Sequence, residues 1–209
     1  MPSVYYHAEK YLDKIDKGAW LEIGTERGDG STKWFCQKSK ECGAKFYAVD
    51  IDDDQIAKLK SLLIDPETNT LFSHVTLEIS KGEDFLKDFY IKYKQFISLV
   101  YLDNFDWNYW IGHEDQWVID IANKYQNKFN TQMTNINSQI AHLLQAVALM
   151  PLLTPNALVV CDDTWFMSEQ GIFSGKSSAA IPYFLANGFK LLESTNSNPG
   201  YVVLGRFSN

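Results

Sequence analysis

Short apolar runs alternate with longer amphipathic segments along most of this chain, and this alternation restricts the folds that it can adopt. Apolar runs of strand length lie at residues 19–23, 45–49, 75–79, 96–102 and 157–161. Each run is followed by a segment with helical spacing of its apolar residues, at 32–40, 54–63, 83–93, 138–153 and 177–187. Strands that alternate with helices in this way predict an α/β fold with a doubly wound, mostly parallel sheet.

The two ends of the chain depart from the alternation. Two strand-like runs, 189–194 and 201–207, are joined by a turn-rich segment without a helical pattern between them. They predict a hairpin, which brings the sheet to seven strands with an antiparallel strand near the C-terminus. At the other end, an apolar stripe predicts an amphipathic cover helix that stops at Gly18, formed by Val4, Ala8, Tyr11, Leu12 and Ile15.

The composition is that of a globular protein with an acidic surface. Of the 209 residues 45% are hydrophobic and 22% are charged, and no linker-like segment divides them, so we expect one domain over 1–209. The formal net charge of −7 disfavours nucleic acid and anionic membranes as partners. Three cysteines without CxxC spacing fit a reducing compartment. With no leader-like start and no apolar run long enough to span a membrane, we expect a cytoplasmic protein.

One long segment, 104–137, interrupts the alternation after the fourth predicted strand. It is rich in aromatic and Asn residues, among them Trp107 and Trp110. An insertion at the carboxyl end of a strand lies where open α/β sheets bind their ligands. We expect a lid or substrate wall; a peripheral pair of helices or an oligomer contact, such as that of a homodimer, is the alternative.

A glycine-rich turn joins the first predicted strand to the first predicted helix. Gly24, Gly28 and Gly30 permit a tight turn, and the free N–H groups at the start of the helix face what the turn holds. The spacing G-x-x-x-G-x-G fits neither the NAD fingerprint nor a P-loop. Glu22, just before the turn, could neutralise a cationic ligand.

Two further strand ends point toward the same ligand. Asp50 ends the second strand about twenty residues beyond the turn, where an acid typically accepts hydrogen bonds from the ribose hydroxyls of a nucleoside. A helix N-cap is the alternative role for such an acid, although Asp52 or Asp53 can serve it here. Gly82 and Glu83 follow the third strand at the same sheet edge.

Acidic residues also end the fourth and fifth predicted strands. Asp103 ends the fourth, and Asp162 with Asp163 ends the fifth. Because the carboxyl ends of neighbouring parallel strands meet at one edge, the three carboxylates can converge in one coordination sphere. Oxygen ligands suit a hard divalent ion, Mg²⁺ first, with Mn²⁺ or Ca²⁺ as alternatives. The alternative is that Asp162 or Asp163 only caps a turn.

This order of motifs resembles the class I S-adenosylmethionine-dependent methyltransferases. Within that class the chain is most similar to the metal-dependent O-methyltransferases of the catechol and macrolide-sugar groups, over residues 19–207. The resemblance implies a Rossmann-like fold, S-adenosylmethionine as cofactor, and a metal on the three acids. It places the methionine end of the cofactor, its ribose and its adenine on a set of residues that comprises Glu22, Gly24, Thr25, Gly28, Ser31, Asp50, Gly82, Glu83 and Asp103.

The general base is less clear from the resemblance. The catechol-type relatives use a lysine three residues after the first metal-binding Asp, where this chain has Asp106, and the macrolide-sugar relatives can use a histidine near the position of Trp165. The candidates that remain are His142, Asp106 and His113. Lys176, at the start of the last helix, could hold an anionic substrate group or lie on the surface.

These features predict a metal-assisted O-methyltransferase that acts on a hydroxylated small molecule or saccharide. A metal bound to the acceptor hydroxyl would lower its pKa and fix its direction. The alternative is a non-catalytic S-adenosylmethionine-binding or scaffold subunit of a biosynthetic assembly, which the missing lysine and histidine favour. An aminopropyltransferase-like or NAD-linked enzyme ranks last.

Overall fold

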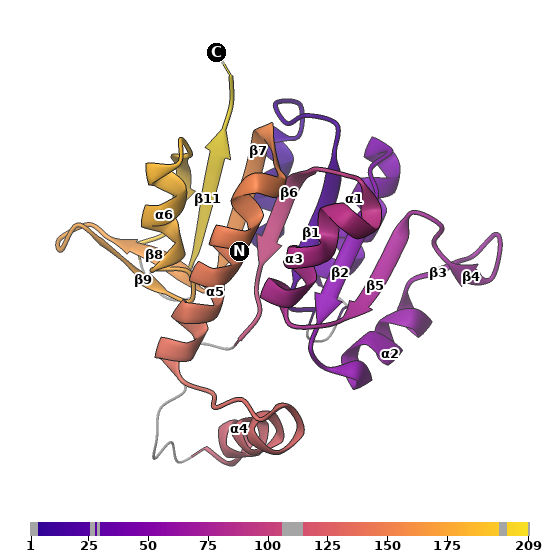
Figure 1. Ribbon diagram of the computed structural model, residues 1–209, viewed down its shortest axis with the longest axis horizontal. Helices are drawn as coiled ribbons and strands as arrows, with labels where there is room; N and C mark the ends of the chain where they lie inside the picture. The colour runs from indigo at the N-terminus through magenta and orange to yellow at the C-terminus, as the bar shows by residue number, and fades with distance from the viewer. Residues whose placement is uncertain (1–3, 26–27, 29, 106–114, 197–199, 209) are drawn as a thin grey trace.

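A twisted sheet forms the centre of the molecule (Figure 1). The computed structural model describes all residues except 1–3, 26–27, 29, 106–114, 197–199 and 209. Within the described residues the main sheet has seven strands in the order β10-β11-β7-β6-β1-β2-β5. Their bounds are β1 Ala19–Ile23, β2 Phe46–Asp50, β5 Val75–Ile79, β6 Ile97–Leu102, β7 Leu153–Asp162, β10 Lys190–Ser194 and β11 Tyr201–Arg206.

Strand β1 lies in the middle of the parallel part of the sheet. It pairs with β2 on one side and with β6 on the other, and all of its residues are buried. Strand β11 runs antiparallel to both β7 and β10, between which it lies. The predicted α/β class, the seven strands and the antiparallel strand near the C-terminus are therefore confirmed.

Helices cover both faces of the sheet. On one face, α3 (Gly82–Tyr93), α5 (Asn135–Leu149) and α6 (Ala180–Ala186) bury side chains against the strands. On the other, η1 (Val4–Tyr11), α1 (Ser31–Cys42) and α2 (Asp53–Leu62) do the same. Helix α4 (Gln116–Phe129) lies apart from these layers, at the edge where the parallel strands end (Figure 1).

Several elements differ from the prediction. The first helix is a 3-10 helix that ends at Tyr11, so its turns are tighter than the predicted α-helical spacing. Helix α5 begins at Asn135 because the Thr134 side chain accepts a hydrogen bond from the Asn137 backbone, and it gives way to η2 (Met150–Leu152), which contains Pro151. Two small hairpins were not predicted: β3 (Ile64–Asp65) with β4 (Thr70–Leu71), and β8 (Thr164–Met167) with β9 (Ile172–Gly175).

None of the helices in the described part of the chain combines the length and the apolar character that a membrane span requires.

The face of the sheet that α6 covers gives a direct test of the packing. Phe184 is completely buried between α6 and the strands, whereas Phe96, just before β6, is 47% exposed. We expect Phe184→Ala to lower the free energy of unfolding by about 3–5 kcal/mol, because it leaves a cavity in the core. Phe96→Ala should cost about 1 kcal/mol or less. Urea unfolding measures both, and equal losses would contradict this packing.

Candidate functional site

The carboxyl edge of the parallel strands holds a cavity of about 330 Å³. Its floor is made by the ends of β1, β2 and β6 and by the start of α3, and its walls come from α4 and α5. The strand order changes direction here, since β2 follows β1 on one side while β6 lies on the other. Open α/β sheets bind their ligands at such a switch point. Five of the predicted cofactor residues line the cavity: Gly24, Asp50, Gly82, Glu83 and Asp103.

Gly24 allows the ends of two strands to approach each other. Its φ is +91°, and a Cβ at this position would lie 2.4 Å from the backbone N of Asn104. The Asp103 backbone N–H donates to the Ile23 carbonyl, and the Gly24 N–H donates to the Val49 carbonyl. The glycine is therefore required by the protein's own backbone at the base of the cavity.

Asp50 ties the glycine turn to the loop that precedes α2. Its Oδ2 accepts hydrogen bonds from the backbone N and the Oγ1 of Thr25, at 2.9 and 3.0 Å, and its Oδ1 accepts one from the Asp52 backbone N at 2.9 Å. A carboxylate offers about four acceptor positions, so one remains for a ligand hydroxyl. Asp52 is the N-cap of α2, which leaves Asp50 free of that role.

Helix α4 of the insertion forms one wall of the cavity. Ile121, Lys124 and Tyr125 line it, with Phe105 and Thr131 from the flanking segments. Its lysines reach the start of α2: Lys124 contacts Asp52, and Lys128 binds Asp52 at 2.9 Å and Asp54 at 2.8 Å. Ion pairs between α4 and the start of α2 thus hold this helix at the wall of the cavity.

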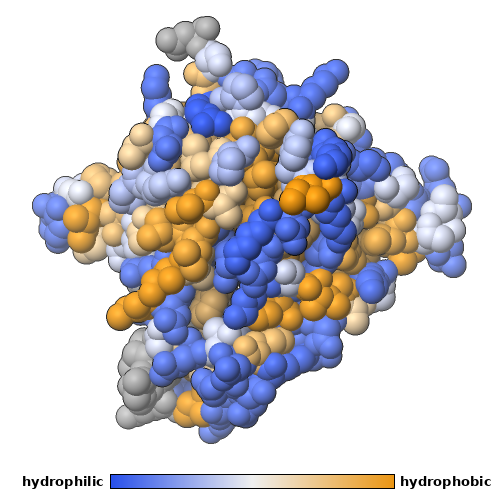
Figure 2. Space-filling model, in the orientation of Figure 1, coloured by the Kyte–Doolittle hydropathy of each residue, from blue (hydrophilic) through white to orange (hydrophobic). Residues whose placement is uncertain are grey.

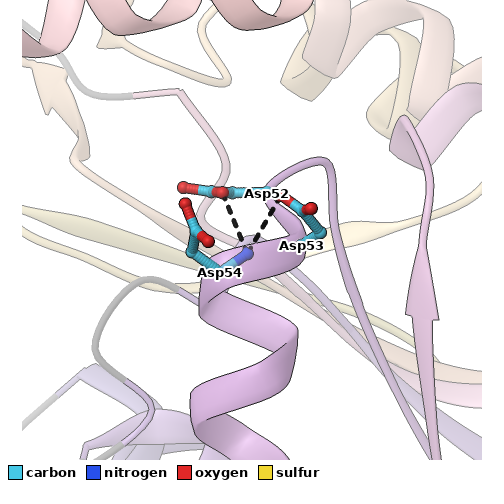
Figure 3. Close-up of side chains that lie close together, drawn as sticks. All are labelled: Asp52, Asp53 and Asp54. Atoms are coloured by element: carbon cyan, nitrogen blue, oxygen red, sulfur yellow. Dashed lines mark hydrogen bonds between the residues drawn. The ribbon is translucent and has the colours of Figure 1, made fainter.

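Figure 3 shows the three acids at the start of α2, Asp52, Asp53 and Asp54. Their oxygens lie within 4.8 Å of one another, as metal ligands would. Lys124 and Lys128 already bind these carboxylates, and the Asp54 backbone N–H donates to the side chains of Asp52 and Asp53. The acidic group therefore has protein partners and serves the contact with α4.

The opposite wall of the cavity is apolar. Ile140, Ala141 and Leu144 of α5 line it, and both Ile140 and Leu144 are 50% exposed. Figure 2 shows apolar side chains in orange along the course of α5, above α4. The two helices therefore give the cavity mainly apolar walls, to which α4 adds the charged Lys124 and α5 the polar Asn137.

The remaining predicted cofactor residues do not line the cavity. Thr25 faces Asp50, and Gly28 lies against Leu59 of α2. Ser31 is the first residue of α1. Glu22 is completely buried, and among the described residues neither of its oxygens has a hydrogen-bond partner in good geometry. Burial raises the pKa of Glu22 to about 8, although Ser31 and Thr32 partly oppose the shift.

The predicted metal ligands are not arranged as an open metal site. Lys176 Nζ lies 2.9 Å from Asp103 Oδ1 and 2.9 Å from Asp163 Oδ2, and the lysine is only 1% exposed. Asp162 Oδ2 accepts a hydrogen bond from the Tyr101 hydroxyl at 2.6 Å. Among the described residues, Asp103, Asp162 and Asp163 do not bring their oxygens into one coordination sphere. The expected convergence on a metal is corrected: a buried ammonium holds two of the acids, and Tyr101 holds the third.

The hairpin β8–β9 delivers Lys176 to this position. The Lys176 backbone N–H donates to the Asp163 carbonyl, and that of Ser177 donates to Thr164 Oγ1. Gly175 has a φ of +98°, and a Cβ there would lie 2.0 Å from the Asp163 carbonyl oxygen. Only the absence of a side chain at residue 175 lets the chain return so close to the end of β7. The prediction that Lys176 is a surface residue is therefore wrong.

Two of the acids near Lys176, Asp103 and Asp162, have raised pKa values. Burial raises the pKa of Asp103 well above its ordinary value; Lys176 opposes the shift, while the charges of Asp162 and Asp163 add to it. Burial likewise raises the pKa of Asp162. These side chains therefore hold protons more readily than surface carboxyls do.

His142 does not line the cavity. It is completely buried in α5, with Nδ1 3.3 Å from Ser177 Oγ, and burial lowers its pKa to about 4. A neutral, enclosed imidazole of such low basicity does not suit a general base that acts on a ligand in the cavity. The other two candidates, Asp106 and His113, lie outside the described residues, as do Trp107 and Trp110.

The fold has relatives among solved structures. A protein from Clostridium thermocellum assigned as an rRNA methylase matches with a TM-score of 0.59 and 15% identity, covering 100% of this chain and 98% of its own. A protein from Streptococcus mutans assigned as a methyltransferase, solved with S-adenosylhomocysteine, matches with a TM-score of 0.56 and 12% identity, covering 99% of both chains. The chain has a methyltransferase fold. A Klebsiella pneumoniae protein assigned as an O-methyltransferase matches with a TM-score of 0.51 and 14% identity over 98% of this chain and 79% of its own.

No family model matches the sequence, and no curated protein matches it significantly. At these identities the solved structures establish the fold.

Gly175 and Gly171 form a matched pair for testing how Lys176 is placed. Both have positive φ, but a Cβ at Gly171 would meet nothing within 4 Å. Gly171→Ala should lower the free energy of unfolding by about 1–2 kcal/mol, the cost of the backbone conformation. Gly175→Ala should cost clearly more, because the added Cβ collides with the end of β7. Urea unfolding of both variants measures the difference, and similar losses would show that the hairpin does not approach β7 so closely.

Glu22 should make stability depend on pH. The folded protein keeps a proton on Glu22 up to pH about 8, whereas the unfolded chain releases it near pH 4.5. The free energy of unfolding therefore falls as pH rises between these values. Glu22→Gln removes this dependence. The free energy of unfolding of the variant, relative to that of the wild type, should therefore rise by several kcal/mol between pH 5 and pH 8.

Urea unfolding at pH 5, 6, 7 and 8 measures this gain. Glu67→Gln, at an exposed position, is the control and should follow the wild type. Parallel pH profiles for Glu22→Gln and the wild type would mean that Glu22 is ionised in the folded protein.

Proposed function

We propose that the chain binds S-adenosylmethionine in the cavity and transfers its methyl group to an oxygen of a hydroxylated small molecule or saccharide. The observation that carries this proposal is the cavity at the switch point of a methyltransferase fold, with the Asp50 carboxylate in its wall. Its volume of about 330 Å³ falls in the range of small-molecule sites. Structures of similar fold were solved with S-adenosylmethionine or S-adenosylhomocysteine.

The residues present fit this cofactor. The free acceptor position of Asp50 suits a ribose hydroxyl, and Gly82 and Glu83 at the start of α3 line the same cavity, where they would border the adenine. Asp103 and Asn104 line the part of the cavity next to the Gly24 turn. When bound, S-adenosylmethionine supplies an electrophilic methyl group on a sulfonium.

The acceptor hydroxyl must lose its proton to a group of the protein. Of the three acids at the ends of β6 and β7, Asp103 is the one that lines the cavity, and burial raises its pKa. A carboxylate with a raised pKa is a stronger base than a surface carboxylate. Asp103 therefore replaces His142 as our candidate for the base.

Oxygen acceptors of small size fit the chain better than RNA does. Two similar structures are assigned as rRNA methylases. The net charge of −7 disfavours a phosphate backbone as the acceptor. A polar, uncharged acceptor is not disfavoured in this way.

A second candidate function is cofactor binding without catalysis, as a scaffold subunit. The enclosure of His142 favours it, because that residue cannot reach a ligand in the cavity. Incubation with methyl-labelled cofactor and a panel of hydroxylated acceptors separates the two functions. Label in an ether product supports methyl transfer to oxygen, and cofactor binding without transfer to any acceptor supports the scaffold.

Asp50 is the residue with which to test cofactor binding. Asp50→Asn keeps the shape of the side chain but loses its charge, and it should raise the Kd for S-adenosylhomocysteine about tenfold or more. Isothermal titration calorimetry measures this, with the exposed Asp88→Asn as a control that should bind like the wild type. No binding by the wild-type protein at high micromolar ligand would refute the proposed function.

A further inference from the structure

Lys176 occupies the place where a cation would join the acidic strand ends. Its ammonium lies between the carboxylates of Asp103 at the end of β6 and Asp163 after β7, 2.9 Å from each. It also lies 3.3 Å from the Asp103 carbonyl oxygen. Each of these oxygens can accept a hydrogen bond from the ammonium group.

The lysine cannot readily leave this position. The backbone N–H groups of Lys176 and Ser177 are bonded to Asp163 and Thr164, and Gly175 lies directly against the Asp163 carbonyl. The side chain is 2% exposed, so a swing toward water would require the hairpin β8–β9 to separate from β7. The positive charge is therefore fixed by the covalent chain.

A divalent ion on these acids would meet two obstacles. It would lie beside the Lys176 ammonium, which is almost completely buried, and the two positive charges would repel each other. It would also have to share the Asp162 carboxylate with the hydrogen bonds that this group accepts from the Tyr101 hydroxyl and from the Asp163 backbone N–H. The donor set at this edge fits an ammonium group and does not fit Mg²⁺.

We infer that the Lys176 ammonium is the resident cation of the acidic strand ends, so that the chain takes no divalent ion there and any methyl transfer proceeds without one. The last clause rests on the proposed function. Lys176 is a positioning residue: it holds Asp103, which lines the cavity, against Asp163, which does not.

Binding of Mn²⁺ alone, followed by electron paramagnetic resonance, tests the inference without methyl transfer. The amount of Mn²⁺ that the protein binds should be the same in the wild type and in Asp163→Asn. Weak binding to the exposed acids at the start of α2 is recognised by its loss in Asp54→Asn. Mn²⁺ that is lost in Asp163→Asn and kept in Asp54→Asn would overturn the inference.

Lys176→Met removes the ammonium and keeps most of the side-chain volume. This variant should gain Mn²⁺ affinity at least tenfold over the wild type, and the gain should disappear in the double variant Lys176→Met/Asp103→Asn. A folded Lys176→Met protein that binds no additional Mn²⁺ would refute the claim that the lysine fills a cation position. If circular dichroism shows Lys176→Met to be unfolded, the wild-type titration alone decides.

A separate measurement of cofactor binding distinguishes a failure of this inference from a failure of the proposed function. Calorimetry with S-adenosylhomocysteine reports on the cofactor site whatever the Mn²⁺ result is. Where methyl transfer is observed, wild-type turnover should be unchanged in EDTA. Loss of turnover in EDTA would contradict the inference that Lys176 takes the place of a divalent ion.

Discussion

The parallel pairing of β1 with β2 and β6 determines what the rest of the structure can do. Because the three strands point the same way, the groups that follow them gather at one edge: the glycine turn, Asp50 and Asp103. Neither helical layer could bring these groups together by itself. The apolar side chains that fill both faces of the sheet, through α3, α5 and α6 on one side and α1 and α2 on the other, keep the strands in register.

The positions of the strands could be predicted because their signal is local. The run at 19–23 coincides with β1, which is buried along its whole length, and the run at 75–79 coincides with the edge strand β5. Asp50, Gly82 and Asp103 could be predicted as cavity residues for a related reason, because each directly follows or ends a parallel strand. That the insertion 104–137 forms a wall of the cavity could be expected, but the position of α4 within it could not, because this segment lacks the alternation of strand and helix patterns.

The residues that escaped prediction depend on contacts between distant parts of the chain. Lys176 and Asp103 are 73 residues apart, and the hairpin that brings them together has little local pattern of its own. Lys124 and Asp52 are separated by 72 residues. The enclosure of His142 likewise follows from packing against Ser177, which no spacing reveals. A run of acids at strand ends therefore predicts concentrated negative charge, but what neutralises that charge is decided by tertiary structure.

The position of β11 has a consequence for the order of assembly. This strand separates β10 from β7, so β10 joins the sheet only through a segment that follows it in the chain. Until β11 pairs, the ten-residue β7 presents an open edge of unpaired backbone groups and apolar side chains, which is a hazard for intermolecular strand pairing. Protection of this edge therefore depends on β11, and a partly folded chain in which β11 is unpaired would expose β7, the strand that carries Asp162, to intermolecular pairing.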